Sequence, residues 1–271
     1  MQKTLVRIAS QIAPGMMANL AYKTLTHPQI RKLRDHEEQI LDQAERKRIS
    51  VLDSEIQTYT WGEGPDSVLM VHGWEGQAGN FSDLVDFLVK KGMKVYAFDG
   101  PSHGRSSQGA TSLFEFAEVV AQMMRTFPSR NLISHSFGGV ASTLALSTNP
   151  DISYDKYLLF TTPDKFRERI QDVSDQVGVT DKVIFRLIKR LETETGVNVN
   201  DQNVSDFVKK IQIEQALILH DVADKVIPLE RSENVVRNWK NASLETVTGT
   251  GHFRILRSEK MWERAWEFLR S

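Results

Sequence analysis

The chain of 271 residues contains no cysteine, which excludes a disulfide framework, a thiolate metal site and a cysteine nucleophile. No apolar run approaches the roughly 18 residues that a spanning helix requires, so we expect no integral membrane span. The 34 basic and 35 acidic side chains leave a net charge of −1, which gives no indication of nucleic-acid binding. The lack of cysteine is also typical of a reducing compartment, and we expect a cytoplasmic protein.

Residues 1–47 form a distinct first region, in which we expect a helical extension. Residues 1–50 carry nine basic and five acidic side chains, a net charge of +4. Apolar residues recur there at loose helical spacing, interrupted by Pro14 and Pro28. The interruption at Pro14 and Gly15, with no small-x-small site after it, favours amphipathic helices over a cleaved signal peptide. We expect these helices to dock on the same chain, with a homodimer through them as the next alternative and contact with a lipid surface as the third.

From about residue 49 the sequence alternates short apolar runs with amphipathic stretches. Val51–Leu52 and Ile56–Tyr59 predict a short antiparallel pair of strands. Further strand candidates are Ser67–Val71, Lys94–Phe98, Asn131–Ser134, Tyr157–Thr161, Ala216–His220 and Ser243–Val247. Helix candidates lie between them, near residues 81–91, 112–126, 137–148, 229–240 and 257–270. Continuous apolar strands separated by helices predict an α/β fold with a mostly parallel sheet covered on both faces.

Residues 164–213 interrupt this alternation, because they separate two strand candidates by about 50 residues, more than a simple crossover needs. Their nine basic and nine acidic side chains balance, and their apolar residues recur at helical spacing. We therefore predict a helical cap over the end of the sheet, inserted between two parts of a core that comprises residues 48–163 and 214–271. Cap residues that we expect in the pocket wall are Phe166, Ile170, Ile184 and Leu187.

The sequence SHSFGG at 134–139 follows one strand candidate and opens a helix candidate. A tight turn from strand to helix exposes one side chain and directs the helix N-terminus towards it. Such a turn needs small residues two positions before and after the exposed one. With Ser136 at the centre, these positions hold Ser134 and Gly138, whereas a centre at Ser134 would bring Leu132 into one of them. Ser136 is therefore the candidate nucleophile.

Three further loops contain groups that would complete a site around this serine. The sequence HGW at 72–74 follows an apolar run, so the backbone N–H of Trp74 could join that of Phe137 in binding an oxyanion. Asp224 lies in the loop after the strand candidate at 216–220, and His252 lies between glycines after the last strand candidate. The carboxyl ends of parallel strands share one edge of the sheet, which is the ligand-binding edge. We therefore expect these groups to meet there.

Other polar residues near these loops have structural alternatives. We expect His72 and His103 to hydrogen-bond within their turns, and Asp99 to brace the turn that follows it. Asp164 and Asp221 are rivals of Asp224 for the role of the acid that orients the histidine. No set of histidine and carboxylate residues has convincing metal-ligand spacing, so we predict no metal and no cofactor.

The chain from about residue 50 to 271 resembles the α/β-hydrolase superfamily. The motifs that carry the resemblance, in the order found in the family, are HGWEG at 72–76, FDGPSHGRS at 98–106, SHSFGG at 134–139, HDVADKVIP at 220–228 and GTGHF at 249–253. The resemblance implies the α/β-hydrolase fold with a helical cap and a triad of Ser136, Asp224 and His252. The sequence departs from the family pattern at Ser134, in place of the usual first elbow glycine, at Ser102, and at Asp221, which occupies a glycine position.

The resemblance implies acyl transfer to water through an acyl-enzyme on Ser136, with His252 as general base and acid and Asp224 as the orienting acid. The serine argues against the branches with an aspartate nucleophile, and the neutral cap argues against an aminopeptidase. We expect a carboxylic ester hydrolase acting on a small uncharged acyl substrate, with His135 as a further pocket residue. The alternatives are a thioesterase, a lactonase, a carbon–carbon bond hydrolase and a non-catalytic binding protein.

Overall fold

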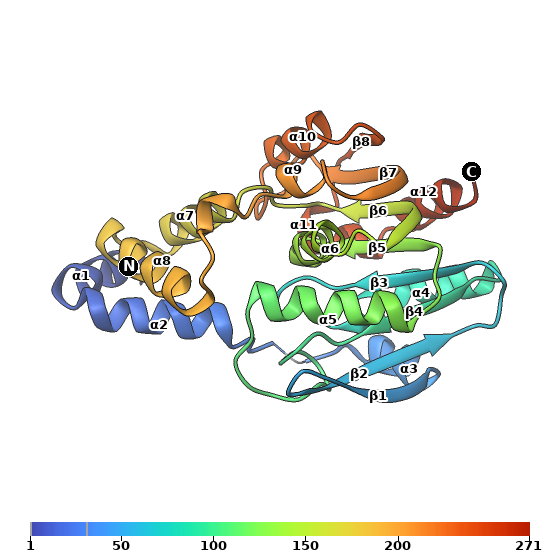
Figure 1. Cartoon of the computed structure of the whole chain (residues 1–271), viewed down its shortest axis with the longest axis horizontal. Coiled ribbons are helices and arrows are strands. Elements are labelled where there is room, and N and C mark those ends of the chain that lie inside the picture. Colours follow the sequence, from blue (N-terminus) through green and yellow to red (C-terminus); the bar gives the residue numbers. More distant parts are fainter. Residues whose placement is uncertain (1, 31) are drawn as a thin grey trace.

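The structure, a computed structural model, describes residues 2–30 and 32–271 (Figure 1). Met1 and Arg31, which the predicted extension includes, lie outside the described residues. Eight strands form one sheet in the order β1-β2-β4-β3-β5-β6-β7-β8. The strands are β1 (Glu45–Val51), β2 (Ser54–Trp61), β3 (Ser67–Val71), β4 (Lys94–Phe98), β5 (Asn131–His135), β6 (Ser153–Phe160), β7 (Gln212–Asp221) and β8 (Ala242–Val247). Only the pairings of β1 with β2 and of β2 with β4 are antiparallel, which confirms the predicted mostly parallel sheet.

Helices cover both faces of the sheet, as the continuous apolar strands predict. Along β3, Val68 and Met70 pack into one buried cluster, and Leu69 and Val71 pack into another. This alternation explains why all five residues of β3 are buried. The first cluster is covered by α3 (Asp35–Asp42), η1 (Ala78–Phe81), α4 (Ser82–Lys90), η3 (Ile255–Arg257) and α12 (Glu259–Arg270); the second is covered by α5 (Leu113–Thr126), α6 (Phe137–Thr148), α9 (Val204–Phe207) and α10 (Leu229–Arg237).

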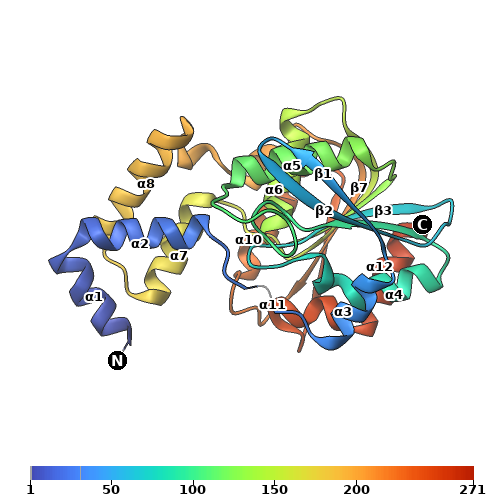
Figure 2. The ribbon, with the colours of Figure 1, turned by 90° about the horizontal axis from the view of Figure 1, so that it is seen from below.

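Four helices lie together at one end of the molecule, beyond the sheet (Figures 1 and 2). These are α1 (Gln2–Ile12), α2 (Pro14–Thr26), α7 (Phe166–Val177) and α8 (Asp181–Thr195), and we call them the helical module. The module has its own buried cluster, formed by Ile170, Ile184, Leu187, Ile188 and Val199, with Ala21, Tyr22 and Leu25 of α2 packed against it. The first two helices of the chain therefore dock on the cap. Among the described residues, no helix is long and apolar enough to cross a membrane.

The predicted domain limits at residues 47 and 213 fall inside strands β1 and β7, and the limit at residue 163 lies between β6 and α7. The limit at residue 47 lies within β1, because the β1–β2 hairpin already pairs Glu45 with Thr60. The helix α3 belongs to the sheet layer, since Ile40 and Leu41 are buried there and the indole N–H of Trp61 donates to the carbonyl of Ile40 at 2.8 Å. The predicted cap, residues 164–213, contains α7, α8, η2 (Val199–Asp201) and α9, of which α9 packs on the sheet.

Candidate active site

Ser136 occupies a sharp turn between β5 and α6, with φ 53° and ψ −119°. A positive φ is unfavourable for a residue with a side chain, so the surrounding structure must impose it. The Ser136 N–H donates to the carbonyls of Phe160, at 3.1 Å, and Thr161, at 2.9 Å, which ties the turn to the end of β6. A Cβ at Gly138 would lie 2.4 Å from the carbonyl oxygens of Val71 and His72, so that position accepts only glycine. The turn has the geometry of a nucleophile elbow.

Ser134, which stands where the family has glycine, is accommodated by a polar partner on the next strand. Its side chain is fully buried, and its Oγ lies 2.8 Å from the hydroxyl of Tyr157 in β6. A buried hydroxyl is costly only when it lacks a hydrogen bond. The departure from the family pattern therefore leaves the elbow intact.

Three side chains from separate loops form a chain of hydrogen bonds at the carboxyl edge of the sheet. The Oγ of Ser136 lies 3.1 Å from Nε2 of His252, and Nδ1 of His252 lies 2.8 Å from Oδ2 of Asp224. Because an ionised carboxylate only accepts, Nδ1 carries the proton and donates it to Asp224. Nε2 is then free to accept the hydroxyl hydrogen of Ser136. The structure thus brings together the three residues that the sequence predicts as a triad.

Asp224 is held as a carboxylate by donors on its own loop. Its Oδ1 accepts the N–H groups of Val226 at 2.7 Å and Ile227 at 2.9 Å. Burial raises the pKa of Asp224, but the hydrogen bonds from His252 and from these two amides outweigh burial and hold the pKa below its usual value. The carboxylate therefore stays charged opposite the His252 ring.

Asp221 does not contact the imidazole but fixes the loop that carries it. Its Oδ2 accepts the N–H of Thr250 at 2.5 Å, the hydroxyl of Thr250 at 2.8 Å and the N–H of Gly251 at 2.8 Å. Its Oδ1 accepts the N–H of Ala223 at 2.8 Å, next to Asp224. Burial raises the pKa of Asp221, yet the amide and hydroxyl donors lower it to about 2. The sequence analysis treated Asp221 only as a rival acid. The signal for its role as a loop anchor was a carboxylate in a position where the family has glycine, together with the GTG loop at 249–251.

The other rival acid, Asp164, joins the cap to α10 and not to the triad. Its Oδ1 accepts the N–H of Ser205 at 2.8 Å, and its Oδ2 accepts the side-chain amide of Asn234 at 2.5 Å. Among the described residues, the only carboxylate that hydrogen-bonds the His252 ring is that of Asp224.

His72, Asp99 and His103 form hydrogen bonds within their turns, as expected for structural residues. Nδ1 of His72 donates to the carbonyl of Gly73 at 2.8 Å, while its Nε2 accepts the N–H of Gly100 at 2.8 Å. Burial holds the pKa of His72 well below its usual value, so the ring is neutral. Asp99 accepts from the Tyr59 hydroxyl and from two backbone amides, and Nδ1 of His103 donates to the carbonyl of Pro101 at 2.9 Å.

The two backbone groups predicted to bind an oxyanion lie on adjoining loops beside Ser136. Phe137 is the first residue of α6, where the helix dipole favours negative charge. Trp74 follows β3, and the rings of Trp74 and Phe137 are 5.3 Å apart. In the described part of the chain, neither a backbone nor a side-chain acceptor takes the N–H of Trp74, which leaves this donor available to a ligand.

His135, predicted as a pocket residue, lies behind the catalytic candidate His252. Its Nε2–H donates to the carbonyl oxygen of His252 at 2.9 Å, and the two rings are 4.8 Å apart. Burial, followed by the proximity of the His252 ring, lowers the pKa of His135 to about 3, so this ring is neutral. His135 therefore supports the backbone of His252.

The cap residues predicted for the pocket wall occupy another place. Ile170, Ile184 and Leu187 are buried in the cluster of the helical module, and Phe166 packs against that cluster. The reason is that α2 supplies an apolar surface for them, so their burial does not require the active-site rim.

The cap reaches the rim through Arg169, which the sequence did not single out. Its guanidinium Nη1 donates to the carbonyl of Val226 at 2.9 Å, two residues from Asp224. A cavity of about 410 Å³ opens beside this loop; Val226, His252 and Phe253 are among its lining residues, and Ser136 is not. The cavity places open space directly next to the imidazole.

Comparisons with known proteins agree with this fold. The family model of the α/β hydrolase fold matches residues 66–153. A pimeloyl-(acyl-carrier protein) methyl ester esterase from Yersinia pseudotuberculosis is 39% identical over 92 residues, which are 33% of this chain and 34% of that protein. A serine hydrolase-like protein from Homo sapiens is 32% identical over 126 residues, 43% of this chain and 60% of that one. The chain thus spans about a third of the length of the first of these relatives.

Solved structures resemble the chain over most of its length. An esterase from Pyrococcus furiosus superposes with a TM-score of 0.67 at 18% identity, covering 92% of this chain and 97% of that one. The thioesterase domain from the curacin biosynthetic pathway superposes with a TM-score of 0.62 at 16% identity, covering 84% and 99%. Together with the sheet order and the elbow, these matches show that the chain has the α/β-hydrolase fold.

Proposed function

We propose that the chain is a serine hydrolase that cleaves a carboxylic ester through an acyl-enzyme. The observation that carries the proposal is the hydrogen-bond chain from Ser136 through His252 to Asp224, with Ser136 at a strained elbow. A serine hydroxyl is a weak nucleophile at neutral pH and needs a base within hydrogen-bond reach. A purely structural serine would need neither the positive φ nor the imidazole.

In the proposed reaction, His252 Nε2 takes the hydroxyl proton as Ser136 Oγ attacks the ester carbonyl. The imidazolium that forms is stabilised by the carboxylate of Asp224, which also keeps the proton on Nδ1. His252 then returns the proton to the leaving alcohol. Water attacks the acyl-enzyme in the second half, with the same imidazole as base, and releases the acid and free Ser136.

The negative charge that develops on the carbonyl oxygen would be bound by the backbone N–H groups of Trp74 and Phe137. Each such donor is worth about 3–4 kcal/mol of transition-state stabilisation. The α6 N-terminus adds its dipole in the same direction. Both donors belong to backbone segments that pack on each other across Gly73 and Gly138, so they are positioned before substrate arrives.

A small to medium uncharged acyl ester is the substrate class that we propose. The first relative is named for a methyl ester, which is an uncharged acyl derivative. A thioesterase, lactonase or carbon–carbon bond hydrolase would use the same three residues. A panel of p-nitrophenyl esters and acyl thioesters of increasing chain length distinguishes these reactions by relative kcat/KM.

Labelling with a fluorophosphonate tests the proposed nucleophile directly. We expect the native chain to be labelled and to hydrolyse p-nitrophenyl acetate, and Ser136→Ala to lose both properties. Ser147→Ala is the matched control, because Ser147 lies on the same helix and its hydroxyl bonds only the carbonyl of Leu144. A folded native chain that takes no label and hydrolyses no ester or thioester would show that the chain is a binding protein.

A further inference from the structure

The first two helices present apolar side chains to solvent although they are docked on the cap. On α1, Leu5, Ile8 and Ile12 recur at the spacing of one helix face and are 61%, 47% and 79% exposed. On α2, Met16 and Leu20 are 65% and 56% exposed. Single exposed apolar residues are ordinary, but five on two consecutive helices are more than scattered exposure and indicate a partner.

Unpaired positive charge accompanies these apolar residues. The first 34 residues of the sequence contain no aspartate or glutamate. Across the described part of the chain, no carboxylate lies within ion-pair distance of the six cations on α1, α2 and the outer face of α8, which are Lys3, Arg7, Lys23, Lys182, Arg186 and Lys189. Around the sheet, Arg125 and Arg264 are paired with acids on neighbouring elements, whereas exposed lysines such as Lys210 and Lys240 have no ion pair among the described residues.

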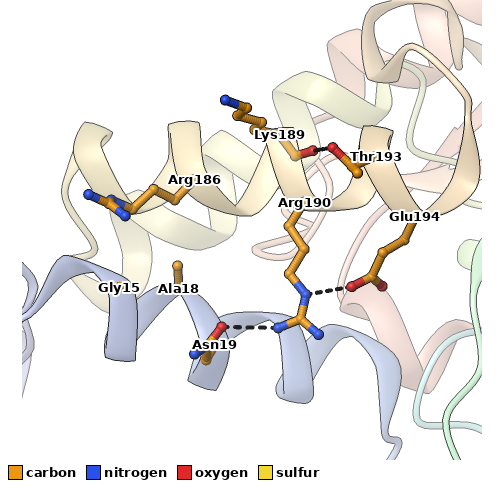
Figure 3. Close-up of a pocket in the computed structure, with 8 residues that line it drawn as sticks. All are labelled: Gly15, Ala18, Asn19, Arg186, Lys189, Arg190, Thr193 and Glu194. Carbon is orange, nitrogen blue, oxygen red and sulfur yellow. Dashed lines mark hydrogen bonds and ion pairs between the residues drawn. The ribbon is translucent and has the colours of Figure 1, made fainter.

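The helix α8 joins the same surface through a groove of about 470 Å³ that it forms with α2 (Figure 3). In this groove Arg190 reaches down to α2, where it bonds Asn19 at 3.0 Å and stacks on the ring of Tyr22. Arg186 lies beside the junction of α1 and α2, with Nη1 3.9 Å from where a Cβ of Gly15 would be. The groove residues of α2 are Gly15, Ala18 and Asn19, so Met16 and Leu20 lie on the other side of that helix. We call the exposed residues of α1 and α2, with those of α8 along the groove, the cationic-apolar face, which extends around the module.

One large aromatic side chain is exposed on α8, outside the groove. Phe185 is 68% exposed and lies on the same side of its helix as Lys182 and Lys189. The exposed acidic residues of α8 are Asp181, in its first turn, and Glu194, which pairs with Arg190 in the groove. An aromatic ring surrounded by lysine and arginine is typical of helices that lie in the plane of a lipid headgroup layer.

The cationic-apolar face is connected to the rim of the active site by the segment that follows α2. The carbonyl of Thr26 accepts the N–H of Thr111 at 2.7 Å. Glu75 accepts the N–H groups of Gln29 at 2.7 Å and Ile30 at 2.6 Å, and it directly follows Trp74. The C-terminal end of α2 therefore lies close to the loop that we assign to the oxyanion, whereas α1 lies at the far end of the module (Figures 1 and 2).

We propose that the cationic-apolar face docks on an anionic lipid surface. Its cations complement anionic headgroups, and its apolar side chains would enter the headgroup–acyl boundary. A second copy of the chain is a poorer occupant, because a two-fold contact would set the same unpaired cations against each other. The proposal does not depend on the hydrolase activity, and its test uses no substrate.

Flotation of the full-length chain with lipid vesicles at physiological ionic strength tests the proposal. We expect binding to vesicles of phosphatidylcholine with 30 mol% phosphatidylglycerol, weak binding to phosphatidylcholine alone, and release at high salt. The charge variant Arg7→Gln/Lys23→Gln/Lys189→Gln should reduce the partition coefficient by roughly 100-fold, since each cation contributes about fivefold. The apolar variant Leu5→Gln/Ile12→Gln/Met16→Gln should reduce it by at least about tenfold.

The matched control is Lys91→Gln/Lys210→Gln/Lys240→Gln, which removes three exposed lysines that precede β4, β7 and β8 at the opposite edge of the sheet. This variant should bind vesicles like the native chain. Circular dichroism melting of all variants separates loss of docking from loss of fold. Absence of binding to anionic vesicles, equal losses in the control, or a dimer in sedimentation that only the apolar variant dissociates, would each overturn the proposal.

Discussion

The active-site rim and the helical module use their polar side chains in opposite ways. At the rim, Asp221, Asp224 and His135 are buried, and each is bonded to a specific donor or acceptor on a neighbouring loop. On the outer face of the module, cations such as Lys23 and Lys189 point to solvent with no carboxylate among the described residues to pair with them. Buried partners fix a geometry, which chemistry requires, whereas unpaired exposed charge favours binding to another surface.

The two regions also differ in how they are held together. The sheet lies between two large apolar clusters, while the module has one small cluster of its own. A few polar contacts join them: Arg169 bonds the Val226 carbonyl, and Arg231 of α10 pairs with Glu168 and, at 3.6 Å, with Asp172 of α7. We therefore expect the module to respond to substitution with little effect on the triad.

The largest expected effect comes from Asp224→Asn, which should lower kcat by about 10⁴-fold while the fold is retained. The amide cannot hold the proton on Nδ1 of His252 as the carboxylate does, so Nε2 no longer accepts the serine proton. Steady-state kinetics with p-nitrophenyl acetate and a melting curve measure the two properties. If Asp224→Asn kept more than a tenth of the native kcat, a residue other than Asp224 would orient His252.

Leu187→Ala should sharpen the contrast between the two regions. Removal of a buried leucine lowers the free energy of unfolding by about 2–5 kcal/mol. Here the loss should appear as faster hydrogen exchange in α2 and α8. The rate of p-nitrophenyl acetate hydrolysis should stay within about twofold of the native rate. The matched substitution Leu88→Ala removes an equally buried leucine of α4, in the sheet core, and should lower the melting temperature of the whole chain. If Leu187→Ala left hydrogen exchange unchanged and lowered kcat/KM for longer esters, Leu187 would line the substrate pocket, as predicted from the sequence.

The strands and the three loops of the site could be predicted because local rules determine them. Five-residue apolar runs such as Ser67–Val71 have few alternatives to a buried strand, and the small residues around Ser136 are required by the tight turn itself. The sequence order of the loops then places Asp224 and His252 at the same edge of the sheet. The strand ends were less accurate: β7 begins at Gln212, where polar residues precede the apolar run.

The packing of the cap helices and the role of Asp221 could not be predicted because they depend on contacts between distant segments. The helical spacing of Ile184 and Leu187 shows that one face is buried, but not that α2, more than 150 residues away, supplies the covering surface. Likewise, the value of Asp221 becomes visible only when the N–H groups of Thr250 and Gly251 are placed opposite its carboxylate. Periodicity identifies a buried face, and only tertiary structure identifies its partner.

A smaller effect on catalysis is expected from Asp221→Asn. Asparagine keeps one acceptor but turns an N–H₂ group towards amide donors, so the loop before His252 should shift and kcat should fall by about 10- to 100-fold, with KM changed far less. Asp164→Asn is the matched control, since that buried carboxylate bonds Ser205 and Asn234 and not the His252 loop. Equal effects of the two substitutions would indicate general destabilisation, and would argue against a specific role of Asp221 in positioning His252.

The smallest expected effect is on acid stability, and it follows from the same carboxylate. The pKa of Asp221 in the folded chain is about 2, below the value of about 3.9 for an unperturbed aspartate. The ionised carboxylate therefore stabilises the folded state. This stabilisation is fully present above a pH of about 3.9 and is lost as the pH falls through about 2. The amide that replaces this carboxylate in Asp221→Asn does not titrate, so the melting temperature of the variant should decline less steeply than that of the native chain between about pH 4 and pH 2.

Because Asp221 is one of 35 acidic residues, the difference in slope between the two melting curves should be modest. Asp53→Asn, at the exposed β1–β2 turn, is the control and should leave the native slope unchanged. Parallel curves for the native chain and Asp221→Asn would mean that the amides of Thr250 and Gly251 do not stabilise the charged form of the carboxylate. Asp221 would then position the loop before His252 through the geometry of its hydrogen bonds alone, and its negative charge would not contribute.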